Sequence, residues 1–194
     1  MTDHYFSKKP KSDPKYNIIE VQVNNTIFKF KTGTGVFSKH KVDRGSLLLI
    51  EKPILGKKIL DFGCGYGPIG IIIKKIYPDC NVTCSDINER AIKLTQENAI
   101  TNNVEIKIIQ SDLFKNVNGT FDTIFINLPQ NAGKDICFKM IKESYEHLNE
   151  EGTLQTVSRH QKGGKQYEKY MLEIFGNVDT LSRGSGYKVY ISKK

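Results

Sequence analysis

The sequence predicts an α/β protein with a doubly wound, mostly parallel sheet, and three observations support this class. From Gly56 onward, short apolar runs alternate with segments of helical periodicity, a pattern typical of parallel strands joined by crossover helices. A loop with alternating glycines, residues 63–67, joins the first of these strands to the first helix. The length of 194 residues suffices for one domain with a full core and a small appendage.

The chain before Gly56 has a different pattern. Residues 17–23 and 26–31 are predicted to be two short strands, because the intervening Asn24-Asn25 tolerates the positive φ of a hairpin turn. Residues 32–46 are rich in glycine and serine and have little periodicity, so we expect a loop there.

The main part of the chain is expected to alternate strands and helices. In order, we predict strand 58–62, helix 68–77, strand 81–86, helix 89–99, strands 104–110 and 121–127, helix 134–148, strand 153–158, helix 163–175, and strands 177–182 and 187–192. The helix at 134–148 has the clearest pattern, since one apolar stripe contains Cys137, Met140, Ile141, Ser144 and Leu148. The last two strands are close enough in sequence to form an antiparallel edge hairpin.

The net charge of +8 is concentrated at the two ends of the chain. Residues 1–58 hold 12 Lys and Arg against 5 Asp and Glu, residues 59–158 hold 9 against 13, and residues 159–194 hold 8 against 3. A basic surface for a polyanion would produce this distribution, and so would an ordinary solvated Lys-rich surface. We expect a basic N-terminal arm with a β-hairpin, residues 1–31, and a main domain, residues 32–194.

The composition argues against several classes of protein. No apolar run approaches the ~18 residues that span a bilayer, and the start of the chain has no apolar signal segment, so we expect a cytoplasmic protein. The four cysteines, Cys64, Cys80, Cys84 and Cys137, form no CxxC pair and have no histidine at zinc-ligand spacing. We therefore expect reduced thiols and no metal.

The glycine loop is of the kind that receives a nucleotide. It follows a strand that contains Asp61 and includes Gly63, Gly65 and Gly67, which let the backbone turn sharply and approach a ligand closely. The helix after it can begin at Pro68 and offers free N–H groups. The segment from Gly65 also satisfies GxGxxG, so a nicotinamide-dependent oxidoreductase is an alternative at this point.

Two carboxylates end successive strands after this loop. Asp86 ends the strand NVTCSD, where it could accept hydrogen bonds from both hydroxyls of a ribose. Asp112, in SDLF after the next strand, could accept from an adenine amine. For each aspartate taken alone, a helix cap or a turn former is the alternative.

A further feature is the corner at the end of the apolar strand in FDTIFINLPQ. The apolar strand stops at Asn127, and Leu128, Pro129 and Gln130 follow. The side-chain oxygen of asparagine and the next backbone carbonyl can each accept one N–H of an exocyclic amine, and proline shapes the corner. A simple strand-end turn is the alternative.

In this order and spacing, the motifs DFGCGYG, SDIN, SDLF and Asn-x-Pro resemble those of class I S-adenosylmethionine-dependent methyltransferases. The loop GVFSKHKVDRGS and the AGK after the corner narrow the resemblance to small-domain methyltransferases similar to ribosomal RNA guanine-N2 methyltransferases, particularly their compact single-domain archaeal-type members. It covers about residues 26–194 and implies a seven-stranded Rossmann-like sheet.

The resemblance implies S-adenosyl-L-methionine as cofactor, S-adenosyl-L-homocysteine as its product and no metal. It implies that the methionine end of the cofactor contacts Asp61, Gly63, Gly65 and Gly67, that the ribose contacts Asp86, and that the adenine contacts Asp112 and Ile87. Phe37 and Ser38 would belong to a loop that closes over the site. Asn127 and Pro129 would form the catalytic corner. For Phe37, a core aromatic that anchors its own loop is the alternative.

The expected function is methyl transfer to an exocyclic amine of a base in structured RNA, with guanine N2 of ribosomal RNA as the first choice. The partner would be ribosomal RNA or a ribosomal particle, and the target base must leave its stack. The candidate phosphate contacts are Lys39, His40, Lys41, Arg44, Arg159, His160, Lys162 and Lys165.

The corner also departs from the family pattern, which is Asn-Pro-Pro followed by an aromatic or aliphatic residue. Leu128 replaces one proline, and Gln130 replaces the apolar residue. A protein-glutamine methyltransferase and a catalytically degenerate cofactor- and RNA-binding module are therefore alternatives. An oxidoreductase would leave Asp61, Asp112 and Asn127 without a role.

Overall fold

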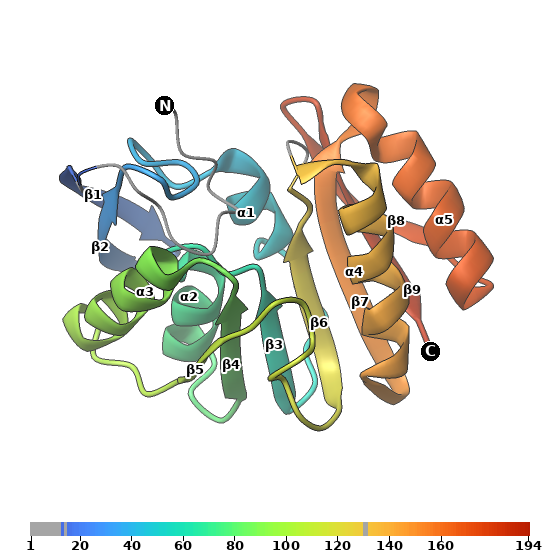
Figure 1. Ribbon diagram of the computed structural model, residues 1–194, viewed down its shortest axis with the longest axis horizontal. Coiled ribbons are helices and arrows are strands. Elements are labelled where there is room, and N and C mark those ends of the chain that lie inside the picture. The colour runs from blue at the N-terminus through green and yellow to red at the C-terminus, as the bar shows by residue number, and fades with distance from the viewer. Residues whose placement is uncertain (1–12, 14, 130–131) are drawn as a thin grey trace. The chain divides into compact units, whose positions relative to one another are not determined.

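The computed structural model describes residues 13, 15–129 and 132–194 (Figure 1). Most of the basic arm expected at the N-terminus lies outside the described residues, and so does Gln130. Among the described residues, no helix is long and apolar enough to cross a bilayer. All four cysteines lie in the described part of the chain, and none of them forms a disulfide.

The elements largely follow the predicted order. They are β1 (Tyr16–Val23), β2 (Thr26–Gly33), α1 (Arg44–Leu49), β3 (Lys58–Phe62), α2 (Pro68–Ile76), β4 (Asn81–Asp86), α3 (Glu89–Thr101), β5 (Lys107–Gln110), β6 (Phe121–Asn127), α4 (Lys134–Glu146), β7 (Leu148–Arg159), η2 (His160–Gly164), α5 (Lys165–Phe175), β8 (Asp179–Gly184) and β9 (Tyr187–Lys193). The strands β1 and β2 form a separate hairpin, as predicted.

The main sheet has seven strands in the order β5-β4-β3-β6-β7-β9-β8. The pairs β4–β5 and β6–β7 are parallel, whereas β9 is antiparallel to both β7 and β8. This order confirms a doubly wound, mostly parallel sheet with an antiparallel hairpin at one edge.

Two short helical segments were not predicted from the sequence. The helix α1 begins inside the segment 32–46, which was expected to be a loop. The sequence did not predict this helix because six residues are too few to show a helical period and because its Arg-Gly-Ser start is typical of a turn. The π-helical turn η2 follows β7 directly. Strand β7 also begins earlier than predicted, so Leu148 is a buried strand residue and not the end of a helix.

The described chain forms two compact units, each made of two segments. The first unit comprises the described residues of Met1–Asp43 and Asp61–Val117, and the second comprises the described residues of Arg44–Leu60 and Asn118–Lys194. The glycine loop lies in the first unit, and Asn127 lies in the second. The division into an arm with hairpin and a main domain at residue 31 stays a prediction.

In the first unit, the outer edge of β2 is covered by two amide side chains, that of Asn98 in α3 and that of Asn102, which caps the end of α3. The Asn98 Oδ1 accepts from the Lys31 N–H (2.7 Å) and its Nδ2 donates to the Lys31 carbonyl (2.9 Å). Asn102 makes the same pair of bonds with Lys29, at 3.1 and 2.8 Å. Four residues of helix rise about 6 Å and two residues of strand about 6.6 Å, so the spacing of the two amides matches that of the two lysines.

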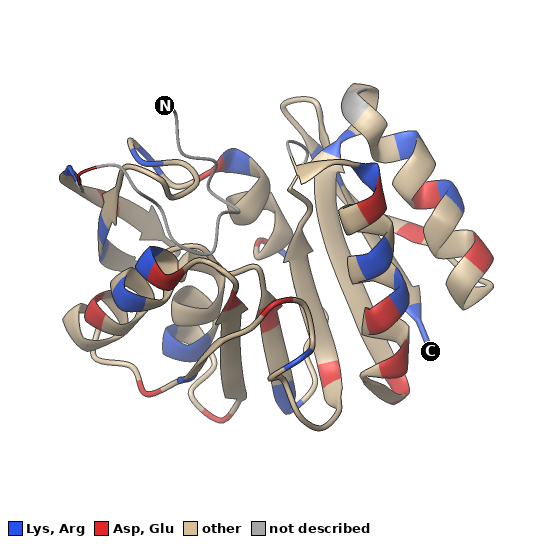
Figure 2. Cartoon of the chain, in the orientation of Figure 1, with Lys and Arg blue, Asp and Glu red and all other residues tan. Residues whose placement is uncertain are grey.

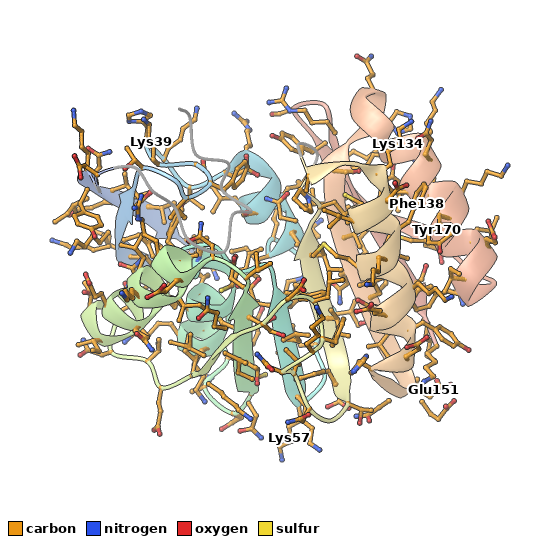
Figure 3. All side chains as sticks on the ribbon, in the orientation of Figure 1. Lys39, Lys57, Lys134, Phe138, Glu151 and Tyr170 are labelled. Atoms are coloured by element: carbon orange, nitrogen blue, oxygen red, sulfur yellow. The ribbon has the colours of Figure 1, made fainter. Side chains whose placement is uncertain are left out.

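In the second unit, α4 and α5 pack on each other through aromatic rings. The Phe138 ring centroid is 4.4 Å from that of Tyr170 and 5.9 Å from that of Tyr167 (Figure 3). The helix α1 packs against β6, β7, β8 and β9, and Ser182 of β8 donates to the Leu48 carbonyl at 3.5 Å. The short α1 is therefore part of the core of this unit.

Candidate functional site

The glycine loop between β3 and α2 has a backbone that favours glycine. Gly63, Gly65 and Gly67 have φ values of 76, 61 and 88°. A Cβ on Gly65 would meet nothing within 4 Å, whereas a Cβ on Gly67 would lie 2.8 Å from Thr95 Cγ2. Gly65 therefore borders open space, as a ligand-receiving loop requires, and Gly67 allows the loop to pack closely on α3.

Main-chain and side-chain groups hold this loop from two sides. The Gly63 N–H donates to the Ser85 carbonyl of β4 (2.8 Å), and the Thr95 hydroxyl of α3 donates to the Gly65 carbonyl (2.9 Å). Because both partners belong to regular elements, the loop is organised before any ligand arrives.

Asn98 connects the glycine loop to the N-terminal hairpin. Its Nδ2 donates to the Tyr66 carbonyl at 2.9 Å in addition to its bonds with Lys31, and the side chain is fully buried. The sequence did not reveal the role of Asn98. The only signal was a pair of asparagines four residues apart in an amphipathic helix, Asn98 and Asn102.

Asp86 shapes the loop and stays accessible. Its Oδ2 accepts from the Gly65 N–H (2.8 Å) and its Oδ1 accepts from the Asn88 N–H (2.9 Å). Burial raises the pKa of this carboxyl to about 6 against the hydrogen bonds that lower it. Asp86 keeps part of its surface exposed to solvent, so a ligand can still approach it.

Asp61 lies beneath the loop and not at its surface. The side chain is 1% exposed, and its Oδ2 accepts from the Gly70 N–H at 2.9 Å, which ties β3 to the first turn of α2. Burial raises the pKa of Asp61 to about 7. Its expected contact with the cofactor stays a prediction, and its visible role is to brace the loop.

The other residues expected near the adenine differ in their surroundings. The Asp112 carboxylate pairs with Lys115, and both side chains are substantially exposed. Ile87 is half-buried, and its carbonyl accepts from Gln110 Nε2 at 3.1 Å. This bond holds the ends of β4 and β5 together.

Phe37 and Ser38 lie in a loop anchored to the start of α3. Phe37 is 40% exposed, so the alternative of a core aromatic is wrong. Ser38 has φ 56°, and its hydroxyl donates to the Lys41 carbonyl at 2.7 Å, which closes a local turn. The Asn88 side chain fixes the same loop by donating to the Gly35 carbonyl at 2.8 Å.

In the second unit, Asn127 ends β6 as predicted and is oriented by a residue that the sequence did not reveal. Its Nδ2 donates to the Ser46 hydroxyl of α1 at 2.9 Å, and Ser46 is buried. The segment that holds Ser46 was expected to be a loop, so only the tertiary structure identifies this contact.

Leu128 and Pro129 form the corner itself. The Leu128 N–H donates to the Val157 carbonyl at 3.1 Å, which extends the β6–β7 ladder by one bond, and its side chain is buried. The Pro129 carbonyl accepts from the Ala132 N–H at 2.9 Å. Leucine is therefore an integral part of this corner, because proline at position 128 could not donate that bond.

The structure distributes the candidate phosphate contacts over both units. Those in the first unit are exposed and are Lys39, His40 and Lys41 (Lys39 is labelled in Figure 3). Those in the second unit are Arg44, Arg159 and Lys165, which are exposed, and His160, which is half-buried. The side chain of Lys162 lies outside the described residues. Among the described residues, no three His, Cys, Asp or Glu side chains gather as a metal site.

Comparisons with known proteins fit this geometry. The family described as "Methyltransferase small domain" matches residues 27–191. A Bacillus subtilis (strain 168) protein described as uncharacterized protein YbxB is 38% identical over 200 residues, covering 100% of both chains.

Longer relatives match as well. Ribosomal RNA small subunit methyltransferase C of Hamiltonella defensa subsp. Acyrthosiphon pisum (strain 5AT) is 32% identical over 183 residues, covering 91% of this chain and 51% of the relative. The chain thus spans about half the length of the curated ribosomal RNA methyltransferases that it matches. A solved T. thermophilus 16S rRNA N2 methyltransferase, in complex with AdoMet and guanosine, has a TM-score of 0.84 and 24% identity, covering 95% of this chain and 52% of its own.

Proposed function

Since the chain belongs to the methyltransferase small-domain family of S-adenosylmethionine-dependent enzymes, we propose that it methylates an exocyclic amine of a base in structured RNA. The family assignment agrees with the motifs read from the sequence. The proposed target is guanine N2 of ribosomal RNA, and the proposed partner is that RNA or a ribosomal particle.

The residues of the first unit fit the expected cofactor. Gly65 borders open space, and the half-buried Asp86 presents a carboxylate beside it. We propose Asp86 for the ribose hydroxyls, Ile87 and Asp112 for the adenine, and the glycine loop for the methionine end. S-adenosylmethionine supplies a methyl group already activated on a sulfonium, so the protein has only to bind and orient the reactants.

The observation that carries the proposal is the orientation of Asn127. The Asn127 Nδ2 donates to the Ser46 hydroxyl at 2.9 Å, and this bond restricts the rotation of the side-chain amide. We assign Oδ1 to one N–H of the target amine.

This assignment explains why an amide ends the strand. An amine conjugated into a purine ring is a poor nucleophile, and its lone pair must point at the methyl carbon. A hydrogen bond accepted by Asn127 Oδ1 orients the amine and favours the positive charge that develops on its nitrogen. No general base is required for this first step.

RNA is preferred as substrate for two reasons. Apart from the uncharacterized protein YbxB, the relatives compared above are described as ribosomal RNA methyltransferases, and the T. thermophilus structure contains guanosine. The basic segments at both ends of the chain favour a polyanion over a neutral glutamine side chain.

The experiment that tests the proposal is a methyl-transfer assay with isotopically labelled S-adenosylmethionine. The substrates are deproteinised small-subunit ribosomal RNA, intact small subunits and a glutamine-containing peptide, and the products are identified by nucleoside and amino-acid mass spectrometry. We expect N2-methylguanosine. Label in glutamine only would establish the protein methyltransferase, and cofactor binding without any product would establish the degenerate module.

The cofactor site has its own test. Asp86→Ala should weaken S-adenosylhomocysteine binding by about 1.5–3 kcal/mol, because a carboxylate that accepts hydrogen bonds is removed. Isothermal titration calorimetry measures the change, with Asp79→Ala as the control because Asp79 is exposed and lies elsewhere in the same unit. Equal affinity of the two variants would remove Asp86 from the cofactor site.

A further inference from the structure

A hollow of about 450 Å³ lies beside the end of β7 in the second unit. Two short segments line it: residues 159–161 and residues 183–188. We call it the hairpin pocket, because the second segment is the tip of the β8–β9 hairpin.

Positive side chains line the hairpin pocket. Its described lining residues include the cations Arg159, Arg183 and Lys188 and no Asp or Glu. Helices α4 and α5 of the same unit differ, since Figure 2 shows both blue and red segments along each of them. The described lining of the pocket thus supplies cations without a carboxylate among them, whereas the two helices carry both signs.

The walls of the pocket are fixed by the backbone. Ser185 and Gly186 both have positive φ, 52 and 81°, which gives the tight turn of a two-residue hairpin. The His160 N–H donates to the Gly186 carbonyl at 3.0 Å, so the two lining segments are tied to each other.

Two of the three cationic side chains, those of Arg159 and Lys188, are held by neighbouring side chains. Arg159 and Tyr187 are partners in the β7–β9 register, and the guanidinium carbon lies 5.1 Å from the tyrosine ring centroid. The Arg159 Nε donates to the Tyr187 hydroxyl at 3.2 Å. Lys188 lies 3.7 Å from Glu168 and is mostly buried. A planar cation stacked on an aromatic ring is a surface on which a nucleic-acid base can stack.

The strand register also locates the pocket relative to Asn127. Asn127 of β6 is paired with Val157 of β7, and Arg159 is two residues further along β7. With about 3.3 Å per residue and about 4.8 Å between strands, the two Cα atoms are about 8 Å apart. Neighbouring nucleotides of one strand could therefore occupy the two places.

We propose that the hairpin pocket binds one nucleotide of the RNA strand that flanks the target base. Arg159 and Arg183 would contact its phosphate, and its base would stack against the Arg159–Tyr187 pair. A volume of about 450 Å³ is within the range of organic-ligand pockets and exceeds what a bare phosphate needs. This inference rests on the proposed function.

The first test compares two double variants that each remove two positive charges from the second unit. In Arg159→Ala/Arg183→Ala, both cations belong to the pocket. In the control, Lys57→Ala/Lys193→Ala, Lys57 precedes β3 and Lys193 lies at the end of β9 remote from Tyr187.

The probe is a short fluorescein-labelled single-stranded RNA, measured by fluorescence anisotropy at several salt concentrations. The pocket variant should raise the dissociation constant about tenfold and flatten the plot of log K against log salt by about 0.7 for each phosphate that is no longer neutralised. The control should change the constant less than about twofold, as expected for ordinary surface lysines. Both should bind S-adenosylhomocysteine as the wild type does.

A second test leaves the charge unchanged. Tyr187→Phe keeps the ring and should keep RNA affinity, whereas Tyr187→Ala should lower it without changing the salt slope. Photo-crosslinking of a 4-thiouridine-containing RNA to the wild type should label a peptide that contains residues 183–188. This experiment does not depend on the folding of any variant.

The outcomes separate this inference from the proposed function. RNA binding that falls equally in the pocket and control variants, with no crosslink at residues 183–188, would overturn the pocket and leave the proposed function standing. A wild type that binds no RNA even at low salt would overturn both.

Discussion

The glycine loop and the Asn127 corner both follow the carboxyl end of a strand, yet they are held in different ways. The loop is fixed by main-chain bonds from β4, by Thr95 and Asn98 of α3, and by two buried or half-buried carboxylates. At the corner, the Asn127 side chain donates to Ser46, the Leu128 N–H donates to Val157, and the Pro129 carbonyl accepts from Ala132.

This difference indicates which step each region controls. A loop braced by a buried network binds a ligand without reorganising, so its residues should affect cofactor affinity and stability. Asn127 lies at the end of β6 and is only half-buried, so its side chain should affect the rate of transfer more than the stability of the unit.

Removal of the Asn127 amide is expected to have the largest effect. Asn127→Ala should lower the methylation rate by about 10²–10³-fold and leave S-adenosylhomocysteine affinity unchanged, because it removes a hydrogen bond that is made to the transition state. Ser46→Ala should lower the rate about tenfold, since the acceptor remains but its orientation is released. Single-turnover assays on a verified substrate measure both.

A third variant sharpens this result. Asn127→Asp keeps two acceptor oxygens but cannot donate to Ser46, so intermediate activity is expected. Equal turnover by the wild type and Asn127→Ala would mean that the corner is only a structural turn.

Position 128 tests whether the corner tolerates the family's usual proline. Leu128→Pro removes the N–H that donates to Val157 and part of a buried side chain, so we expect a loss of about 2–4 kcal/mol in the free energy of unfolding. Leu128→Met keeps the N–H and the volume and should cost less than about 1.5 kcal/mol. Urea unfolding compares the two, and equal losses would show that the main-chain bond contributes nothing.

Asn98 and Asn102 offer a matched pair in the first unit. Either change to alanine exposes the edge of β2 and should cost about 1–3 kcal/mol of stability, because buried hydrogen bonds are removed. Only Asn98 also holds the Tyr66 carbonyl, so only Asn98→Ala should weaken S-adenosylhomocysteine binding, severalfold. Calorimetry on both variants separates loop bracing from hairpin bracing, and equal affinities would disconnect the hairpin from the loop.

The carboxylates of the two units should give stability an opposite dependence on pH. Burial raises the pKa of Asp61 to about 7, so the folded state binds more protons than the unfolded state. Stability therefore falls by up to about 1.4 kcal/mol per pH unit as pH rises from about 4 to 7. Hydrogen bonds, first from the Lys58 N–H, lower the pKa of Asp122, so its stabilisation is lost as pH falls through the acid range.

Urea unfolding at several pH values checks both signs. Asp61→Asn should flatten the decline between pH 5 and 7, and Asp122→Asn should leave that decline intact while removing the loss at acid pH. A decline that persists in Asp61→Asn would assign it to Asp86 or to another group.

Local patterns were sufficient for the sheet and for the motif positions. The alternation of apolar runs and helical periods predicted β3 to α4 with small errors at the ends, and the glycine loop, Asp86 and Asn127 lie where the spacing placed them. The sequence could not reveal Ser46 or Asn98, because their roles depend on partners 81 and 67 residues away along the chain.

Charge patterns were less informative than geometry. The basic segments predicted a surface for a polyanion, but they did not distinguish Arg159, Arg183 and Lys188, which line one pocket, from lysines elsewhere on the same unit. The assignment of Leu148 to a helix was wrong because a buried leucine fits the apolar stripe of a helix as well as the start of a buried strand.

The amide pairs on β2 also determine how the N-terminal hairpin can meet other copies of the protein. An open strand edge recruits strands from neighbouring molecules and is a common start of domain swapping and aggregation. Lys29 and Lys31 already exchange both of their main-chain hydrogen bonds with α3, so this edge offers no template there. A strand added to the hairpin would have to pair with β1, and loss of Asn98 or Asn102 would turn a closed edge into a site of self-association.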